Sequence, residues 1–97
     1  MKYIEKEIFE IAKKVITDLN PNALKYEKIE DIIFNNEKKL IAGVKAGELH
    51  PCWTVLILTI GDNTNFLVIS DDTGEPLYYQ NFNMDVFEIE KADGKYF

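Results

Sequence analysis

The sequence contains no arginine, and its eleven basic residues are all lysine. Arginine is the side chain that best grips phosphates, carboxylates and guanine edges through paired hydrogen bonds. Its absence and the net charge of −6 disfavour binding to nucleic acids and to anionic membranes. A chain of this charge would instead attract a basic protein partner.

The chain holds a single cysteine, Cys52, and a single histidine, His50. A lone cysteine excludes an intramolecular disulfide and any zinc site built from several cysteines. A catalytic thiol would need a nearby base, and His50 is held by Pro51 in a poor position to reach Cys52. We therefore predict a buried Cys52, a His50 with a surface hydrogen bond, no metal or cofactor, and no enzymatic activity.

Long apolar runs are missing, since none approaches the roughly 20 residues that a membrane-spanning helix needs. The first seven residues turn acidic and amphipathic where a secretory signal would stay apolar. We therefore expect a cytoplasmic protein without a membrane segment. Linkers, internal repeats and low-complexity tracts are also missing. Because 97 residues can enclose one hydrophobic core, residues 1–97 are predicted to form a single domain.

Apolar residues recur at helical spacing between residues 4 and 19 and form one stripe, opposite a face of mixed charge. Asn20 and Pro21 end this pattern, because the residue before a proline avoids helical geometry. The pattern predicts a helix over residues 4–19 whose stripe faces the core. The stripe consists of Ile4, Ile8, Ile11, Ala12, Val15, Ile16 and Leu19.

Residues 53–79 hold two apolar segments and an aromatic one, separated by turn-forming residues at 61–65 and 71–76. This pattern predicts an antiparallel meander of three strands. In the first strand, Trp53, Val55 and Ile57 share one face, and the opposite face is also apolar, through Leu56, Leu58 and Ile60. One helix can cover only one face. The other is expected to enclose a pocket, to pack on a twin subunit or to receive a foreign protein.

The segments that flank the meander are less regular. Residues 22–36 suit either a helix or a strand, and we interpret them as a strand that enters a turn at 35–38. Residues 39–45 would then pair back as a second strand, and residues 46–51 would form a loop. Residues 86–90 are expected to add an edge strand, and residues 91–95 a frayed tail. The predicted class is α+β, with an N-terminal helix packed on a curled antiparallel sheet of four to six strands.

Part of the meander resembles known families over residues 50–80. Trp53-Thr54-Val55, the strand with Val68 and Ile69, and the turn at residues 71–77 resemble the repeat of PepSY-like domains. The same residues are similar to the C-terminal hairpins of small bacterial immunity proteins with a nuclear-transport-factor-two-like fold, which belongs to the cystatin-like group of one helix on a curled sheet. The first resemblance implies peptidase inhibition or regulation outside the cytoplasm. The second implies toxin binding inside it.

The excess negative charge lies in the second half of the chain. Residues 1–50 hold nine acids and nine lysines, whereas residues 51–97 hold eight acids and two lysines. This asymmetry would speed association with a basic partner. We predict a non-catalytic protein-binding domain, either an immunity-type inhibitor or a homodimeric accessory protein of bacterial origin.

The candidate partner surface combines the acidic turn with the aromatic residues and the single histidine. If Tyr78 points outward while Tyr79 points inward, the Tyr78 ring is the best candidate for a binding hot spot. The alternative is a small-molecule-binding or minor enzymatic domain, with a pocket between helix and sheet. The residues assigned to the partner or ligand surface are Trp53, Tyr78, Tyr79, Asp71, Asp72, Glu75 and His50.

Overall fold

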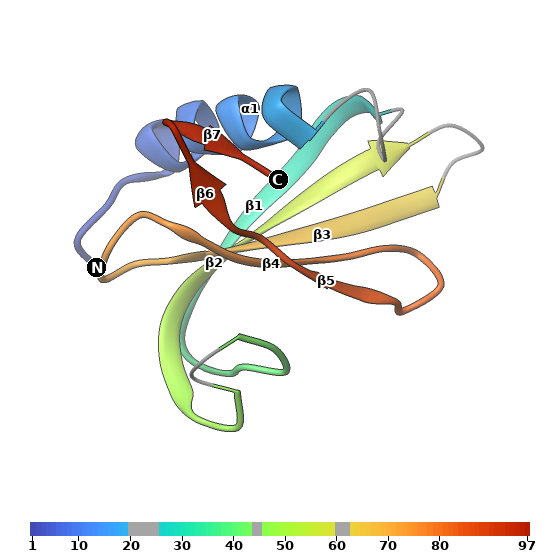
Figure 1. The fold of residues 1–97 in the computed structure, drawn as a ribbon. Coiled ribbons are helices and arrows are strands. Elements are labelled where there is room, and N and C mark those ends of the chain that lie inside the picture. The colour runs from blue at the N-terminus through green and yellow to red at the C-terminus, as the bar shows by residue number, and fades with distance from the viewer. Residues whose placement is uncertain (20–25, 44–45, 60–62) are drawn as a thin grey trace.

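A computed structural model describes residues 1–19, 26–43, 46–59 and 63–97. It confirms the predicted α+β arrangement of one helix on an antiparallel sheet, and the five strands follow each other in sequence order without closing into a barrel (Figure 1). The elements are α1 (Glu5–Leu19), β1 (Tyr26–Lys39), β2 (Leu49–Thr59), β3 (Asn63–Ser70), β4 (Pro76–Gln80), β5 (Val86–Glu88), β6 (Lys91–Ala92) and β7 (Lys95–Tyr96). The last two form a separate small hairpin.

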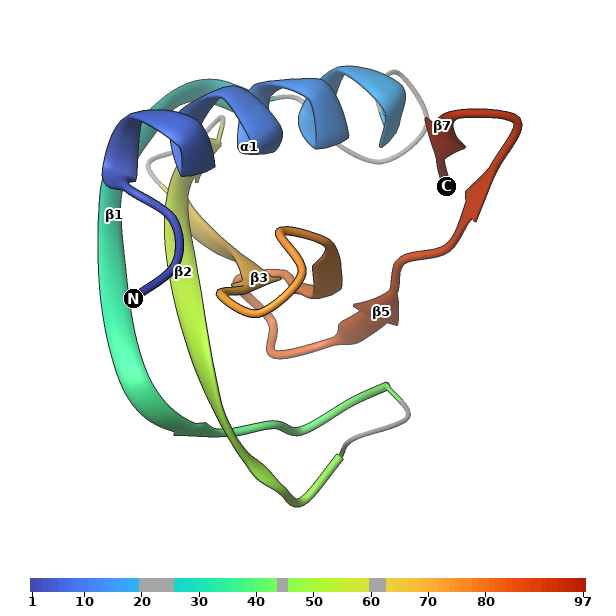
Figure 2. The same cartoon turned by 90° about the vertical axis from the view of Figure 1, so that its left-hand side faces the viewer.

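The main core lies between α1 and one face of the sheet (Figure 2). Four residues of the predicted stripe are fully buried there, so the helix prediction is confirmed. Ile4 is an exception: it precedes the helix and is exposed. Its amide donates to the Glu7 carboxylate at 3.0 Å, which caps the helix. The sheet contributes Trp53, Val55, Ile57, Leu67, Ile69 and Tyr79.

Strands β1 and β2 are longer than the others and curve away from the helix at one end (Figure 2). The strand interpretation of residues 22–36 is confirmed for residues 26–36, and residues 22–25 lie outside the described residues. The predicted turn at residues 35–38 is wrong, and so is the predicted second strand over residues 39–43. Strand β1 continues to Lys39 and pairs with β2, and a register shift between Asn35 and Lys38 accommodates the turn-forming residues as an irregularity within the strand. Strand β2 also begins within the predicted loop, at Leu49.

The chain reverses between β1 and β2 through residues 40–43 and 46–48, which we name the tip loop. Its ends are joined by backbone hydrogen bonds from Leu40 to Glu48 at 3.0 Å and from Gly47 to Leu40 at 2.7 Å. The loop folds back beneath the sheet face that does not carry α1 (Figure 2). Of the residues predicted as the second strand, 44 and 45 lie outside the described residues.

The meander of β2, β3 and β4 is confirmed, as is the hairpin turn between β3 and β4. This turn, residues 71–75, is named the acidic turn, and the Gly74 amide donates to the Ser70 carbonyl across it at 2.9 Å. The other predicted turn, at residues 61–65, is wrong for residues 63–65, which belong to β3. Residues 60–62 lie outside the described residues.

Gly74 has a φ of +73°, a conformation that glycine adopts more readily than other residues. A Cβ atom there would lie 2.6 Å from the Tyr3 hydroxyl oxygen and 2.7 Å from the ring carbon that bears it. We expect Gly74→Ala to lower the free energy of unfolding by about 2 kcal/mol, from the backbone conformation and the displaced ring together. Urea denaturation measures the loss.

Gly94 provides the matched control for this substitution. Its φ is +75°, but a Cβ there would meet nothing within 4 Å. Gly94→Ala should therefore show the conformational cost alone, about 1 kcal/mol. Equal losses in the two variants would contradict the packing of Tyr3 over the acidic turn.

The C-terminal residues depart partly from the prediction. The edge strand is confirmed as β5, but the frayed tail predicted for residues 91–95 is wrong, because β6 and β7 form a hairpin. Tyr96 anchors this hairpin against α1 and is 7% exposed. Its amide donates to Asp18 at 3.2 Å, and its hydroxyl donates to Glu75 in the acidic turn at 3.3 Å. Tyr96 itself lies just beyond residues 91–95, the segment predicted to fray.

Candidate functional site

The face of the sheet opposite α1 is partly covered by the tip loop of the chain itself. Leu40 of this loop is buried in a second apolar cluster with Cys52, Val68 and Tyr78. Ala42 and Leu77 pack against the same cluster. The chain thus supplies a cover for this face that was not among the three alternatives drawn from the sequence.

Tyr78 and Tyr79 belong to the two different clusters, which places them on opposite faces of the sheet, in agreement with their alternation in the sequence. Tyr78 is nevertheless 1% exposed, because the tip loop covers it. The prediction of an exposed Tyr78 ring is therefore wrong. Trp53 and Tyr79 are buried as well, in the main core beneath α1.

Asp71 is the most highly connected residue of the acidic turn and is 2% exposed. Its Oδ1 accepts hydrogen bonds from Trp53 Nε1 at 2.8 Å and from the Tyr3 amide at 3.1 Å, and its Oδ2 accepts one from the Lys2 amide at 2.7 Å. Burial raises the pKa of Asp71, and these hydrogen bonds lower the pKa by more, so the net shift is downward. Asp71 therefore joins the N-terminal segment to the sheet and is not available to a partner.

His50, Ser70 and Asp72 bring together the residue types of a catalytic triad. His50 Nε2 lies 2.8 Å from Ser70 Oγ and 3.7 Å from Asp72 Oδ2. In a working triad the serine and the acid contact opposite nitrogens of the imidazole, whereas here both face Nε2. Ser70 Oγ also accepts the Asp72 and Thr73 amides and is buried. The three residues stabilise the acidic turn, and His50 is buried rather than on the surface.

Cys52 is buried, as predicted, and its thiol donates a hydrogen bond to the His50 carbonyl at 3.2 Å. Burial raises the pKa of the thiol to about 11, so it stays protonated near neutral pH and is not nucleophilic there. Among the residues that the structure describes, no three His, Cys, Asp or Glu side chains gather as a metal site would require.

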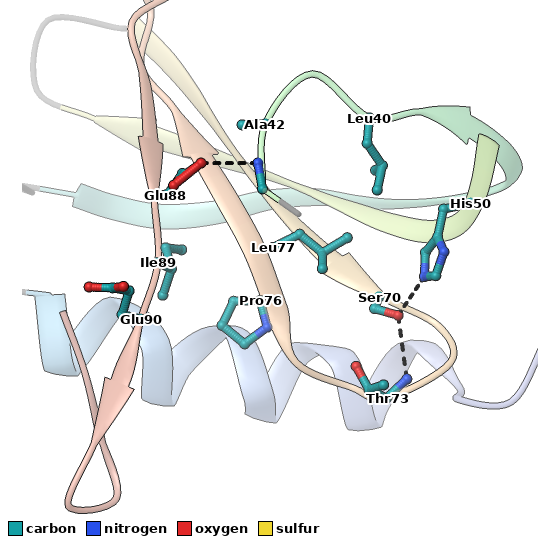
Figure 3. A pocket seen from close by; sticks show the side chains of 11 residues that line it. Leu40, Ala42, His50, Ser70, Thr73, Pro76, Leu77, Glu88, Ile89 and Glu90 are labelled. Carbon is teal, nitrogen blue, oxygen red and sulfur yellow. Dashed lines mark hydrogen bonds between the residues drawn. The ribbon is translucent and has the colours of Figure 1, made fainter. Parts of the chain in front are cut away.

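A groove of about 370 Å³ lies between the tip loop, the acidic turn and residues 88–90 (Figure 3). Its apolar lining comes from Leu40, Pro76, Leu77 and Ile89. Glu88 and Glu90 line one end, and His50, Ser70 and Thr73 line the other. We name it the acid-rimmed groove.

Carboxylates outnumber cations around this groove. Glu88 Oε1 accepts the Gly43 amide of the tip loop at 3.2 Å, and no described cation lies within ion-pair distance of Glu88 or Glu90. The acidic turn adds Asp72, which lies 3.7 Å from His50 Nε2 and 3.6 Å from Lys2 Nζ. Three carboxylates, those of Glu88, Glu90 and Asp72, therefore face one lysine, which leaves the rim negative.

Of the predicted partner surface, His50 lines the acid-rimmed groove and Asp72 borders it, 3.7 Å from His50 Nε2. Glu75 is paired elsewhere, with the Tyr96 hydroxyl and with Lys91 of the C-terminal hairpin. The sequence interpretation missed the contributions of the tip loop and of residues 88–90. The apolar run Leu40-Ile41-Ala42 predicts a strand, whereas the structure places it in the tip loop. No local pattern connects that run with Glu88, which the Gly43 hydrogen bond brings beside it.

Comparison of the chain with family models, with curated proteins and with solved structures found no match. The described part of the chain includes no helix of the length and apolar character needed to cross a membrane. The geometry and charge of the surface are therefore the basis for assigning a function.

Proposed function

We propose that this chain is a non-catalytic domain that binds a basic segment of another protein in the acid-rimmed groove. The observation that carries the proposal is the combination of an apolar lining with a rim of three carboxylates, those of Glu88, Glu90 and Asp72. Lysine and arginine pair a long apolar stem with a cationic head, so both parts find a matching surface there. An immunity-type inhibitor of a basic toxin, which the sequence resemblance implies, is one protein of this kind.

The charge of the chain supports a basic partner over a second copy. A second copy would also carry a net charge of −6 and would bring carboxylates against carboxylates at this groove. The polar end of the groove disfavours a catalytic role, because Ser70 Oγ accepts hydrogen bonds from the Asp72 and Thr73 amides of the turn. The acidic rim would also steer a basic partner and raise its association rate.

A short synthetic peptide of alternating lysine and leucine provides a direct probe. We expect it to bind the protein, and the affinity to fall as salt is added, because the charges at the rim are exposed to solvent. The double variant Glu88→Gln/Glu90→Gln should weaken this binding by about tenfold, since it removes two rim charges. Glutamine at position 88 retains an oxygen that can accept the Gly43 amide. Fluorescence anisotropy of a labelled peptide measures the affinities.

The matched control is Glu10→Gln/Glu30→Gln, which makes the same charge change at two exposed residues outside the groove. This variant should bind the peptide as the parent protein does. A glutamate–leucine peptide should not bind. Equal weakening in the two double variants would show attraction to the net charge alone and would overturn the proposal.

A further inference from the structure

A second cavity, of about 450 Å³, lies on the α1 side of the sheet, between the end of the helix, β3, β4 and the residues after β4. We name it the aromatic pocket. Its apolar lining comes from Leu19, Phe82, Phe87, Ile89 and Phe97. The volume falls within the range of roughly 300–1,000 Å³ that is usual for small-molecule sites.

Three phenylalanines around the aromatic pocket are unusually exposed. Phe82, Phe87 and Phe97 are 50%, 52% and 59% accessible to solvent. Large exposed apolar side chains that lie close together mark a surface where binding of a ligand or partner is favourable. Flat aromatic rings also favour an aromatic occupant, which can stack against them or meet their edges.

Two buried polar residues, Asn65 and Tyr79, also line the pocket, and they are 5% and 4% exposed. Asn65 Oδ1 accepts the Phe82 amide at 2.8 Å, which fixes the orientation of the side-chain amide. Asn65 Nδ2 therefore donates to the Tyr79 hydroxyl. Among the residues that the structure describes, the Tyr79 hydroxyl accepts this hydrogen bond and donates none. Burial raises the pKa of Tyr79 to about 12, so the hydroxyl hydrogen is retained near neutral pH.

The charged residues of the lining disfavour an anionic ligand. Asp18 lines the pocket and is paired with Lys14 at 2.9 Å, and the hydrogen bond from Lys14 lowers the pKa of Asp18. Glu88 lines the pocket as well, but its carboxylate accepts the Gly43 amide of the tip loop. A carboxylate ligand such as a fatty acid would meet the negative Asp18.

We propose that the aromatic pocket binds a small uncharged aromatic molecule that carries one hydrogen-bond acceptor, which receives the Tyr79 hydroxyl hydrogen. The phenylalanines supply the apolar contact, and Tyr79 supplies the polar selectivity. This site is distinct from the one proposed for protein binding: Glu88 and Ile89 line both cavities, but Tyr79 and the three phenylalanines do not line the acid-rimmed groove.

Three naphthalene derivatives of similar size provide the test: 2-acetylnaphthalene, 2-ethylnaphthalene and 2-naphthoate. Two-dimensional amide NMR titrations of the intact protein give the affinity and the location of each. We expect 2-acetylnaphthalene to bind with shifts at the amides of Phe82, Phe87 and Phe97, which line this pocket and not the acid-rimmed groove. It should bind about fivefold more tightly than the ethyl compound, which has no acceptor, and 2-naphthoate should bind more weakly than either.

Tyr79→Phe should abolish the preference for the acetyl over the ethyl compound and retain binding of both. Tyr78→Phe, on the opposite face of the sheet, is the control and should keep the fivefold preference. Thermal unfolding of each variant shows that it is folded. Loss of both ligands in Tyr79→Phe with the fold intact, a preference unchanged by it, or no shifts around the pocket would overturn the proposal. Self-association detected by light scattering, with concentration-dependent shifts at the amides of the three phenylalanines, would overturn it too.

Discussion

Asp71→Ala is expected to lower the free energy of unfolding by about 3–5 kcal/mol, because it removes a buried carboxylate that several donors share. The Trp53 indole and the Lys2 and Tyr3 amides would lose their acceptor together. The N-terminal ammonium group, 3.7 Å from Asp71 Oδ2, would lose its partner as well. Urea or thermal denaturation measures the loss directly.

Asp72 is the adjacent control, since its side chain is 43% exposed. Asp72→Ala should cost less than about 1 kcal/mol, which is typical of exposed ion pairs. If both alanine variants lost the same stability, the central role of Asp71 in joining the N-terminus to the sheet would be contradicted.

The same carboxylate predicts a pH dependence. The pKa of Asp71 is lower in the folded protein than its ordinary value of 3.8, which applies to the unfolded chain. Its contribution to stability is therefore complete above pH 3.8 and declines as the pH falls through the folded pKa. The stability difference between the parent protein and Asp71→Asn should be constant at neutral pH and shrink below pH 3.8. A difference that grew on acidification would contradict this assignment.

Leu40→Ala is expected to cost about 2–4 kcal/mol, since it removes a buried leucine from the cluster beneath the tip loop. Leu40 is 2% exposed and packs with Cys52, Val68 and Tyr78. Its loss should loosen the tip loop and increase the binding of an apolar fluorescent dye to the uncovered face. Denaturation and dye fluorescence measure the two effects.

The neighbouring residue Ile41 is 53% exposed and offers the control. Ile41→Ala should change stability by less than about 0.5 kcal/mol. If the tip loop did not cover the sheet, the two substitutions would lower stability by similar, small amounts. That outcome would contradict the packing of Leu40 against the sheet.

The helix and the meander could be predicted because their signals are local. The stripe from Ile8 to Leu19 and the strands on either side of the acidic turn each show their own period and their own turn residues. The same local reasoning failed at residues 35–38, where turn-forming residues are accommodated within a long strand. Strand pairing over that distance depends on tertiary contacts, which no local pattern reports.

The candidate site was harder to predict than the fold for the same physical reason. The alternation of Tyr78 and Tyr79 was readable, but the burial of Tyr78 depends on Leu40, far away in the sequence. Likewise, the acidic turn was visible in the sequence, whereas Glu88 joins its groove only through the folded position of the tip loop. The face to which a side chain points follows from the strand period. The segment that covers that face does not follow from it.

Mapping the lysine–leucine peptide by two-dimensional amide NMR tests the proposed function most directly. If the acid-rimmed groove binds basic segments, the largest shifts will fall on amides of its lining, among them Leu40, Thr73 and Leu77. The exposed face of α1, including Glu10, should be unaffected. Shifts centred on α1, or spread evenly over the acidic residues of the chain, would contradict the proposed function.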